Sequence, residues 1–472
     1  MGESEGVVVR KTETGCTFHQ RLKCSDKTNR KLASEGASKV FRNNNEKNSE
    51  ATITRVLKQI QKKKQKNSEE DEEFEFVNVV LGKCFIDKSL ETTVRTKCNQ
   101  FEFPDRIPKQ LVYKHTGRLL SDVNTSSKNK KSVVLDKPRM NRILESFNNL
   151  IMGLNLLKKK NISIHNISSQ NIICKDDDKI LFDEFGLTRY YEKIYNFKMN
   201  EKIRKKMKSD DKIEDVYKNA SLYIRDSKGT DINFAPELKM YYYIVKYIHK
   251  QTTQRNYGYY PNYRNQRNDD SYETIKKNIE KELIEKTSRV DGKDWNISKL
   301  QTLYKQTELD EIKDEHLKIS LITMILSLLA KVQTQKEETE ETEETEKTDT
   351  TEFEKFTGWV NKVLTEQADK IDVYAIGIVI LEFYVACLKK NLEIDKRDEL
   401  LRIIRNSTTP NVFDRWNTEQ LCEAYNNYIN PQKNVGIDSL ELMLRLDEKQ
   451  GGSIPKKKNQ SLKTFSETHH EG

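Results

Sequence analysis

Two short segments constrain the fold of this chain more than any other part of its sequence. One is Gly-Thr-Asp-Ile-Asn-Phe-Ala-Pro-Glu-Leu at residues 229–238, and the other is Asp-Val-Tyr-Ala-Ile-Gly-Ile-Val-Ile-Leu-Glu at residues 372–382. Each segment joins a carboxylate, Glu237 or Asp372, to an apolar run. Residues 239–366 separate them, so a fold that uses both segments must accommodate a long stretch between them.

The two segments resemble signatures of the C-terminal lobe of the eukaryotic-type protein kinase superfamily, Gly-Thr-x-x-Tyr-x-Ala-Pro-Glu and Asp-Val-x-Ser-x-Gly. The resemblance runs from about residue 7 to about residue 430 and is dense over residues 141–190, 229–238 and 369–385. It implies an α+β fold, bilobal and protein kinase-like, with a small β-rich N-lobe and a larger helical C-lobe. With its long insertion and Lys- and Asn-rich composition, the chain is similar to divergent kinase-like proteins of large DNA viruses.

The resemblance also implies domain boundaries. The N-lobe takes residues 1–118 and includes a charged, solvated loop near 61–75. The C-lobe takes residues 119–448, with an insertion at 239–366 that contains the low-complexity stretch 336–353. Residues 449–472 are expected to be a flexible tail.

Hydrophobic periodicity predicts the main elements. Strands are expected at residues 7–9, 37–41, 74–84, 110–113, 171–174 and 179–182. Helices are expected at residues 51–60, 141–157 and 317–330. Residues 121–138 are polar and are expected to form a loop.

The N-lobe carries the residues that the resemblance assigns to a nucleotide. Gly15 occupies the place of the glycine-rich loop over the phosphates, and Lys39 resembles the strand lysine that pairs with them. Glu50 is the first choice for the helix carboxylate that holds this lysine, and Glu46 is the second. Tyr113 lies in the strand that leads to the hinge, where backbone groups would hold adenine.

The predicted catalytic loop differs from the family pattern His-x-Asp-x-Lys-x-x-Asn. His165 and Asn171 are kept, but the stretch between them is one residue shorter. Asn166 follows the histidine, and Ser168 or Ser169 stands where the lysine is expected. The carboxylate that would accept the substrate proton is therefore absent from the loop.

The metal motif of the family, Asp-Phe-Gly, is also altered. The chain reads Asp183-Glu184-Phe185-Gly186, so Glu184 replaces the aspartate. Asn171, Glu184 and Asp183 are the candidate Mg²⁺ ligands, although the longer Glu184 would shift an octahedral site. Asp183 is expected on the opposite face of a continuing strand, so only a local bulge would turn it into the site.

Three residues have structural roles that the resemblance implies. Gly186 completes the altered metal motif, and Glu237 corresponds to a glutamate that forms a buried ion pair with a C-lobe arginine. Asp372 corresponds to an aspartate that braces the backbone of the catalytic loop. These roles concern the fold and not turnover.

The altered motifs favour a pseudokinase that still binds ATP with Mg²⁺ and acts through protein binding. General base catalysis contributes about 10²–10⁴-fold, so losing the base, the loop lysine and a metal ligand predicts a very slow enzyme. The alternative is an active serine/threonine protein kinase with a protein substrate. A second alternative is a structural or nucleic-acid-binding viral component, in which the aromatic and arginine residues of 241–267 stack on bases; an ordinary loop against the C-lobe is the favoured interpretation of that stretch.

Composition adds limits on compartment and membrane association. The formal net charge of +9 is a mild bias over 472 residues. The seven cysteines are odd in number and include no Cys-x-x-Cys pair, which favours free thiols in a reducing compartment over zinc or disulfides. The apolar run 317–330 is too short to span a bilayer. The sequence therefore predicts a cytoplasmic protein without a transmembrane segment, in host cytoplasm or a virion.

Overall fold

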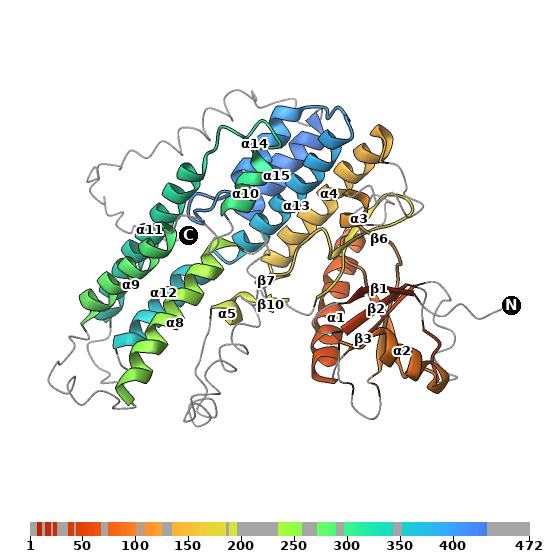
Figure 1. The fold of residues 1–472 in the computed structure, drawn as a ribbon, viewed down its shortest axis with the longest axis horizontal. Helices are drawn as coiled ribbons and strands as arrows, with labels where there is room; N and C mark the ends of the chain where they lie inside the picture. Colours follow the sequence, from red (N-terminus) through yellow and green to blue (C-terminus); the bar gives the residue numbers. More distant parts are fainter. Residues whose placement is uncertain are drawn as a thin grey trace, which may run out of the picture. The chain divides into compact units, whose positions relative to one another are not determined.

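An antiparallel sheet and a set of long helices make this an α+β fold (Figure 1). The computed structural model describes residues 7–11, 15–19, 22–25, 36–41, 44–67, 74–100, 103, 107, 109–124, 135–185, 188–195, 235–256, 271–288, 297–342 and 352–431. Contacts divide the chain into one unit of Met1–Ile429 and a second of Asn430–Gly472, and the elements named here belong to the first. The predicted tail 449–472 lies outside the described residues.

The main sheet has five strands in the order β1-β2-β3-β5-β4. Its strands are β1 (Val7–Lys11), β2 (Gly15–His19), β3 (Ala37–Phe41), β4 (Val80–Cys84) and β5 (Gln110–Tyr113). The predicted strands 37–41 and 110–113 are confirmed with these bounds. All of their residues are buried, as expected for strands whose side chains alternate between two packed layers. Of the predicted strand 74–84, only its second half forms β4, and Val77 makes an isolated parallel bridge to Phe182.

Helix α1 (Asn44–Asn67) packs against the sheet and extends the predicted helix 51–60 at both ends. It runs into the stretch 61–75, which was expected to be a charged loop, so that prediction is wrong for residues 61–67. Lysine and glutamine are good helix formers, and the helix continues through them once its apolar face is packed.

Four cysteines that were expected to be free thiols form two disulfides. Cys16 of β2 pairs with Cys98 at the end of α2 (Glu91–Lys97), and Cys24 pairs with Cys84 of β4. Cys174, Cys387 and Cys422 take no part in a disulfide. The argument for a reducing compartment therefore fails for four of the seven cysteines, because sequence spacing does not reveal which cysteines meet in space.

Short strands and a long helix follow the main sheet. They are β6 (Arg118–Leu119), α3 (Leu120–Asn124), α4 (Lys137–Lys158), β7 (Ile162–Ser163), β8 (Ile172–Cys174), β9 (Ile180–Phe182), β10 (Arg189–Tyr190) and α5 (Tyr191–Ile194). The predicted helix 141–157 and the predicted strands 171–174 and 179–182 are confirmed. The predicted loop 121–138 is interrupted by α3 and by the start of α4, where the Asp136 side chain caps the helix by accepting from the Arg139 amide.

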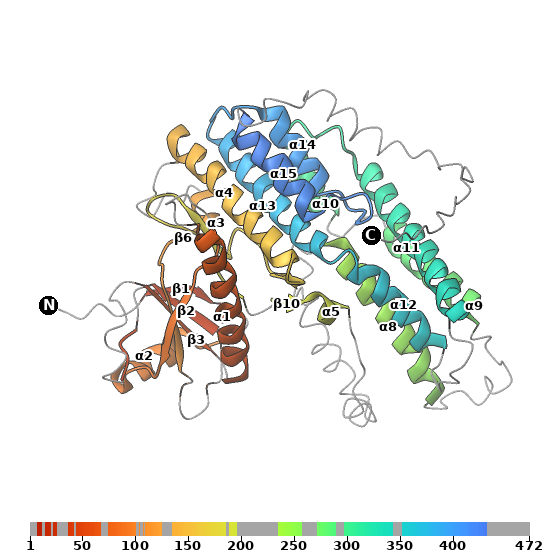
Figure 2. The same cartoon turned by 180° about the vertical axis from the view of Figure 1, so that it is seen from behind.

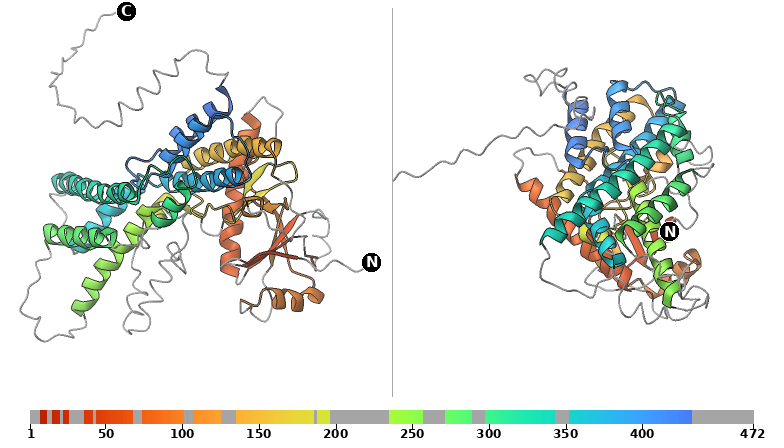
Figure 3. Two further views of the ribbon diagram at one scale, coloured as in Figure 1. Left: turned by 45° about the horizontal axis from the view of Figure 1, so that its top comes forward. Right: turned by 90° about the vertical axis from the view of Figure 1, so that its left-hand side faces the viewer.

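Helices fill the remainder of the described chain (Figure 2). They are α8 (Pro236–Asn256), α9 (Tyr272–Ser288), α10 (Ile297–Tyr304), α11 (Asp314–Thr342), α12 (Glu352–Thr365), α13 (Asp369–Lys389), α14 (Arg397–Ser407) and α15 (Thr418–Ile429). The stretch 239–366 is thus largely helical, and α9, α11 and α12 pack side by side (Figure 3). The predicted helix 317–330 is confirmed within α11, which continues into the low-complexity stretch 336–353 as far as Thr342.

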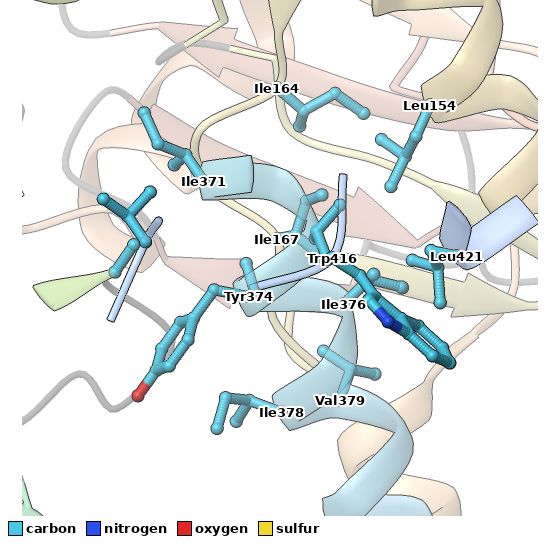
Figure 4. Close-up of a cluster of buried hydrophobic side chains, with 14 of the residues drawn as sticks. Leu154, Ile164, Ile167, Ile371, Tyr374, Ile376, Ile378, Val379, Trp416 and Leu421 are labelled. Atoms are coloured by element: carbon cyan, nitrogen blue, oxygen red, sulfur yellow. The ribbon is translucent and has the colours of Figure 1, made fainter. Parts of the chain in front are cut away.

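Helix α13 is buried on nearly all sides, as its uniformly apolar sequence requires. Its residues Ile371, Tyr374 and Ile376 lie in one cluster with Ile164 and with Trp416 from the segment before α15 (Figure 4). Gly377 is needed on this helix, because a Cβ there would lie 2.6 Å from the Ser407 side chain of α14. This packing places α13 directly beneath the segment that follows β7.

Two helices of the described residues are long and apolar enough to span a membrane. The apolar window of α13 is 89% buried by protein and that of α11 is 39% buried. Length and apolarity also suit a buried core helix, so no clear transmembrane segment is present in the described part of the chain.

Gly153→Ala in α4 is expected to lower the free energy of unfolding by about 1–3 kcal/mol, because the new Cβ would overpack the core. It would lie 2.2 Å from the Phe76 ring. Urea denaturation measures the change. Gly358→Ala in α12 is the matched control, since no atom lies within 4 Å of its new Cβ; alanine should stabilise this helix by about 0.5–1 kcal/mol. Equal stabilisation by both variants would contradict the close packing at Gly153.

Candidate functional site

A buried lysine between two carboxylates is the centre of the candidate site. The Lys39 Nζ atom lies 2.6 Å from Glu50 Oε2 and 2.5 Å from Glu184 Oε1. All three side chains are buried. The three residues come from β3, from α1 and from the segment after β9, so the site joins parts of the chain that are far apart in sequence.

Local structure explains why these side chains meet. Lys39 is in the middle of β3, on the same face as Leu111 of β5, and Glu50 lies in the part of α1 that crosses this face. Glu184 has a backbone φ of 70°. Residues with a side chain rarely adopt this left-handed conformation, and its cost is of order 1–3 kcal/mol. The turn directs Glu184 to Lys39.

The charges in the site shift one another's pKa values. Burial acts to lower the pKa of Lys39, but the nearby Glu184 and Glu50 charges outweigh burial and hold this pKa above its usual value. Burial raises the pKa of Glu50, and the neighbouring Glu184 charge adds to the rise against the opposing effect of Lys39. Two carboxylates and one ammonium leave an excess of negative charge, so the lysine stays protonated.

Tyr113 adds a hydroxyl group to this cluster. Its side chain is buried and its Oη donates a short hydrogen bond to Glu50 Oε1. Burial, with the charges of Glu50, Asp183 and Glu184, raises the pKa of Tyr113 far above its usual value, so it stays a donor. The sequence placed Tyr113 in a strand leading to a hinge and did not foresee this contact of its side chain.

Asp183 points to a different partner from Glu184. Asn78 Nδ2 donates to Asp183 Oδ1 at 3.2 Å, and the same amide group donates to the His115 carbonyl at 3.1 Å. The Asp183 amide donates to the Asn171 carbonyl at 2.9 Å. Neighbouring residues 183 and 184 therefore reach different groups, and the left-handed backbone conformation is at Glu184.

The loop from Ser163 to Asn171 is held by one carboxylate of α13. Asp372 accepts hydrogen bonds from Ser163 Oγ at 3.0 Å and from the amides of Ile164 and His165 at 2.9 Å each. His165 has a φ of 65°, which places it in the left-handed region. Burial raises the pKa of Asp372 to about 6 in spite of these hydrogen bonds.

Further hydrogen bonds hold the remaining residues of this loop. Asn171 Nδ2 donates to the Asn166 carbonyl at 3.1 Å, and the Asn171 amide donates to the Ser168 carbonyl at 2.9 Å. Ser169 accepts from the Ser121 amide through its carbonyl. The loop contains no Asp or Glu side chain, so it supplies no carboxylate as a general base.

Glu237 at the start of α8 forms a buried bidentate ion pair. Arg415 Nη1 lies 2.7 Å from Glu237 Oε1, and Arg415 Nη2 lies 3.0 Å from Glu237 Oε2. Both side chains are fully buried, and Arg415 also donates to the carbonyls of Thr409, Lys370 and Pro410. Arg415 was not named from the sequence, because no local pattern marks the partner of Glu237.

Several predicted residues are placed away from the lysine cluster or cannot be placed. Gly15 lies in β2, where a Cβ would be 2.1 Å from the Val40 carbonyl oxygen, so the strand pairing itself accounts for this glycine. Gly186 and residues 229–234 lie outside the described residues, as do the tyrosines and arginines of 257–267. The side chain of Glu46 is also outside them.

The candidate Mg²⁺ ligands are already engaged within the protein. Glu184 pairs with Lys39, Asp183 accepts from Asn78, and the Asn171 side chain donates to Asn166. Among the described residues, no group of three His, Cys, Asp or Glu side chains is arranged to hold a metal ion. The protonated Lys39 ammonium can form a charge-assisted hydrogen bond to an anionic oxygen.

Comparison with known proteins adds no family assignment, since no family model and no curated protein matches this chain.

Proposed function

We propose that this chain is a bilobal, protein kinase-like pseudokinase that binds a nucleotide at Lys39 and acts through protein binding. The observation that carries the proposal is the ion pair of Lys39 with Glu50 of α1. A buried lysine fixed by a helix carboxylate is how such a fold presents a cation to the phosphates of ATP. The brace at Asp372 and the Glu237–Arg415 pair support the same architecture.

The same residues argue against efficient phosphoryl transfer. The segment 163–171 supplies no carboxylate to accept a proton, and Lys39 is engaged by Glu184. A nucleotide must therefore displace the Glu184 carboxylate from Lys39 before its phosphates can take that place. This competition makes Glu184 an intrinsic inhibitor of nucleotide binding, which Mg²⁺ would relieve only by drawing Glu184 away.

Lys39→Ala is expected to weaken ATP binding by about 10–100-fold, because it removes a charge-assisted contact to phosphate. Glu184→Gln is expected to act in the opposite direction and tighten ATP binding about tenfold in the absence of Mg²⁺, since an amide does not compete for the lysine. Isothermal titration calorimetry measures both changes. Arg55→Ala, an exposed change on α1, is the control and should bind as the wild type does.

A transfer assay with γ-labelled ATP and Mg²⁺ or Mn²⁺ separates the pseudokinase from an active protein kinase. We expect no label transfer by the wild type to itself or to a general protein substrate. Transfer by the wild type that is lost in Lys39→Ala would establish an active kinase with an unusual catalytic loop. Absence of ATP binding in both the wild type and Glu184→Gln would reject the nucleotide site and leave protein binding as the function.

A further inference from the structure

A cavity far along the chain from Lys39 lies where α10, α11, α14 and the segment after α14 meet. Its volume is about 400 Å³, within the range of about 300–1,000 Å³ that small-molecule sites occupy. Two thirds of its lining residues come from α10, α11 and the segment between them, in the stretch 239–366, and the remaining third comes from α14 and residues 409–410. Nothing in the proposed nucleotide site uses this cavity.

The floor of the cavity is apolar. Leu317 and Pro410 are buried, and Ile312 and the ring of Tyr304 complete the surface. The Tyr304 hydroxyl is already engaged with Thr408 Oγ1 at 2.6 Å, and Thr408 Oγ1 in turn donates to the Ile404 carbonyl. Tyr304 therefore presents its ring to the cavity without requiring a polar partner there.

The polar groups around the cavity are mainly donors. His316 Nδ1 accepts from the Lys313 amide, so its Nε2 carries the hydrogen in the neutral ring. Ser320 Oγ accepts from the Asn411 amide, so its own hydrogen is left to donate. Arg405 lines the cavity with an exposed guanidinium and makes no ion pair among the described residues.

Only one acceptor of comparable strength faces these donors in the lining. It is the exposed carboxylate of Glu311, which is not paired with Arg405 in the described structure. Three donors, one of them permanently charged, therefore surround an apolar floor. A ligand that satisfies them has an apolar body and a single acidic group.

We propose that this cavity binds a small organic anion, with a carboxylate or phosphate-type group at Arg405, His316 and Ser320 and an apolar body on Leu317 and Tyr304. Hydrogen bonds of Arg415 connect the wall of this cavity to the buried core of the helical region. Arg415 donates through Nε to the Thr409 carbonyl and through Nη2 to the Pro410 carbonyl in the cavity wall, and both of its Nη atoms donate to Glu237. A bound anion thus stabilises the segment that positions the Glu237–Arg415 pair.

Fluorescence titration of the full chain with anilinonaphthalene sulfonate, an apolar anion, tests the proposal. Saturable binding to the wild type is expected, and Arg405→Gln should raise Kd at least about tenfold because a charge-assisted hydrogen bond is lost. Thr409→Phe, which fills the cavity and keeps the Thr409 carbonyl, should raise Kd by a similar factor. Neutral N-phenylnaphthylamine should bind the wild type at least about tenfold more weakly than the sulfonate.

Arg397→Gln is the matched control, since it removes the same charge from the opposite end of α14 and should leave Kd unchanged. Circular dichroism melting confirms that each variant is folded before titration. The proposal is overturned if the wild type shows no saturable binding, if the neutral dye binds as tightly as the sulfonate, or if Arg405→Gln or Thr409→Phe leaves Kd within about twofold of the wild type.

Discussion

Arg415→Met is expected to lower the free energy of unfolding by about 3–5 kcal/mol, because it leaves the buried Glu237 carboxylate without a counter-charge. Both partners of this pair are fully buried, and the two nitrogen–oxygen distances are 2.7 Å and 3.0 Å. The same change removes the donors that serve the Thr409, Lys370 and Pro410 carbonyls. Urea denaturation of the purified variant measures the loss.

Two comparisons make this result specific to the buried pair. Arg397→Met breaks an exposed ion pair with Glu308 and should cost less than about 1 kcal/mol. The double variant Glu237→Gln/Arg415→Met should be more stable than Arg415→Met alone, because no uncompensated charge remains. A cost for Arg415→Met no larger than that of Arg397→Met would show that the pair contributes little to the fold.

Asp372→Asn is expected to change how stability depends on pH. The folded-state pKa of Asp372 is about 6, against an ordinary value of 3.8, because burial disfavours its charge. A carboxyl group whose pKa is raised by folding stabilises the folded state below its unfolded pKa and loses this contribution as pH rises through its folded pKa. Between about pH 4 and pH 6 the wild type should therefore lose up to about 3 kcal/mol that the amide variant keeps.

Urea denaturation at a series of pH values, with the wild type and Asp372→Asn side by side, measures this difference. The free energy of unfolding of the wild type minus that of Asp372→Asn should fall from pH 4 to pH 6 and then stay constant. Asp395→Asn is the control, since Asp395 is exposed and forms a surface ion pair with Lys137; such pairs are worth little, so this variant should differ from the wild type by less than about 1 kcal/mol throughout the series. A rise of this difference with rising pH would mean that the hydrogen bonds to Asp372 outweigh the effect of its burial.

The elements of secondary structure were largely predictable because their signals are local. Strands 37–41 and 110–113 and the apolar helices at 141–157 and 317–330 follow from periodicity within each segment. The end of α1 was missed because a run of lysines has no periodic apolar face, yet it has good helix propensity and continues an anchored helix.

The candidate site was only partly accessible from the sequence. Lys39, Glu50 and Asp372 could be named because each occupies a recognisable pattern. The contacts of Tyr113 with Glu50, of Asn78 with Asp183 and of Arg415 with Glu237 could not be named. Each joins residues separated by 63 positions or more, and no local pattern encodes such a pairing.

The sequence by itself determined the α+β class, most strands and helices, and the absence of a carboxylate from the loop 163–171, because composition and short-range periodicity decide all of these. Only the tertiary structure decided that Glu184 turns to Lys39, that four cysteines pair, and that α10 and α11 enclose a cavity with α14. These features depend on which distant side chains the packed core brings within a few ångströms, and burial then sets their charges and their partners.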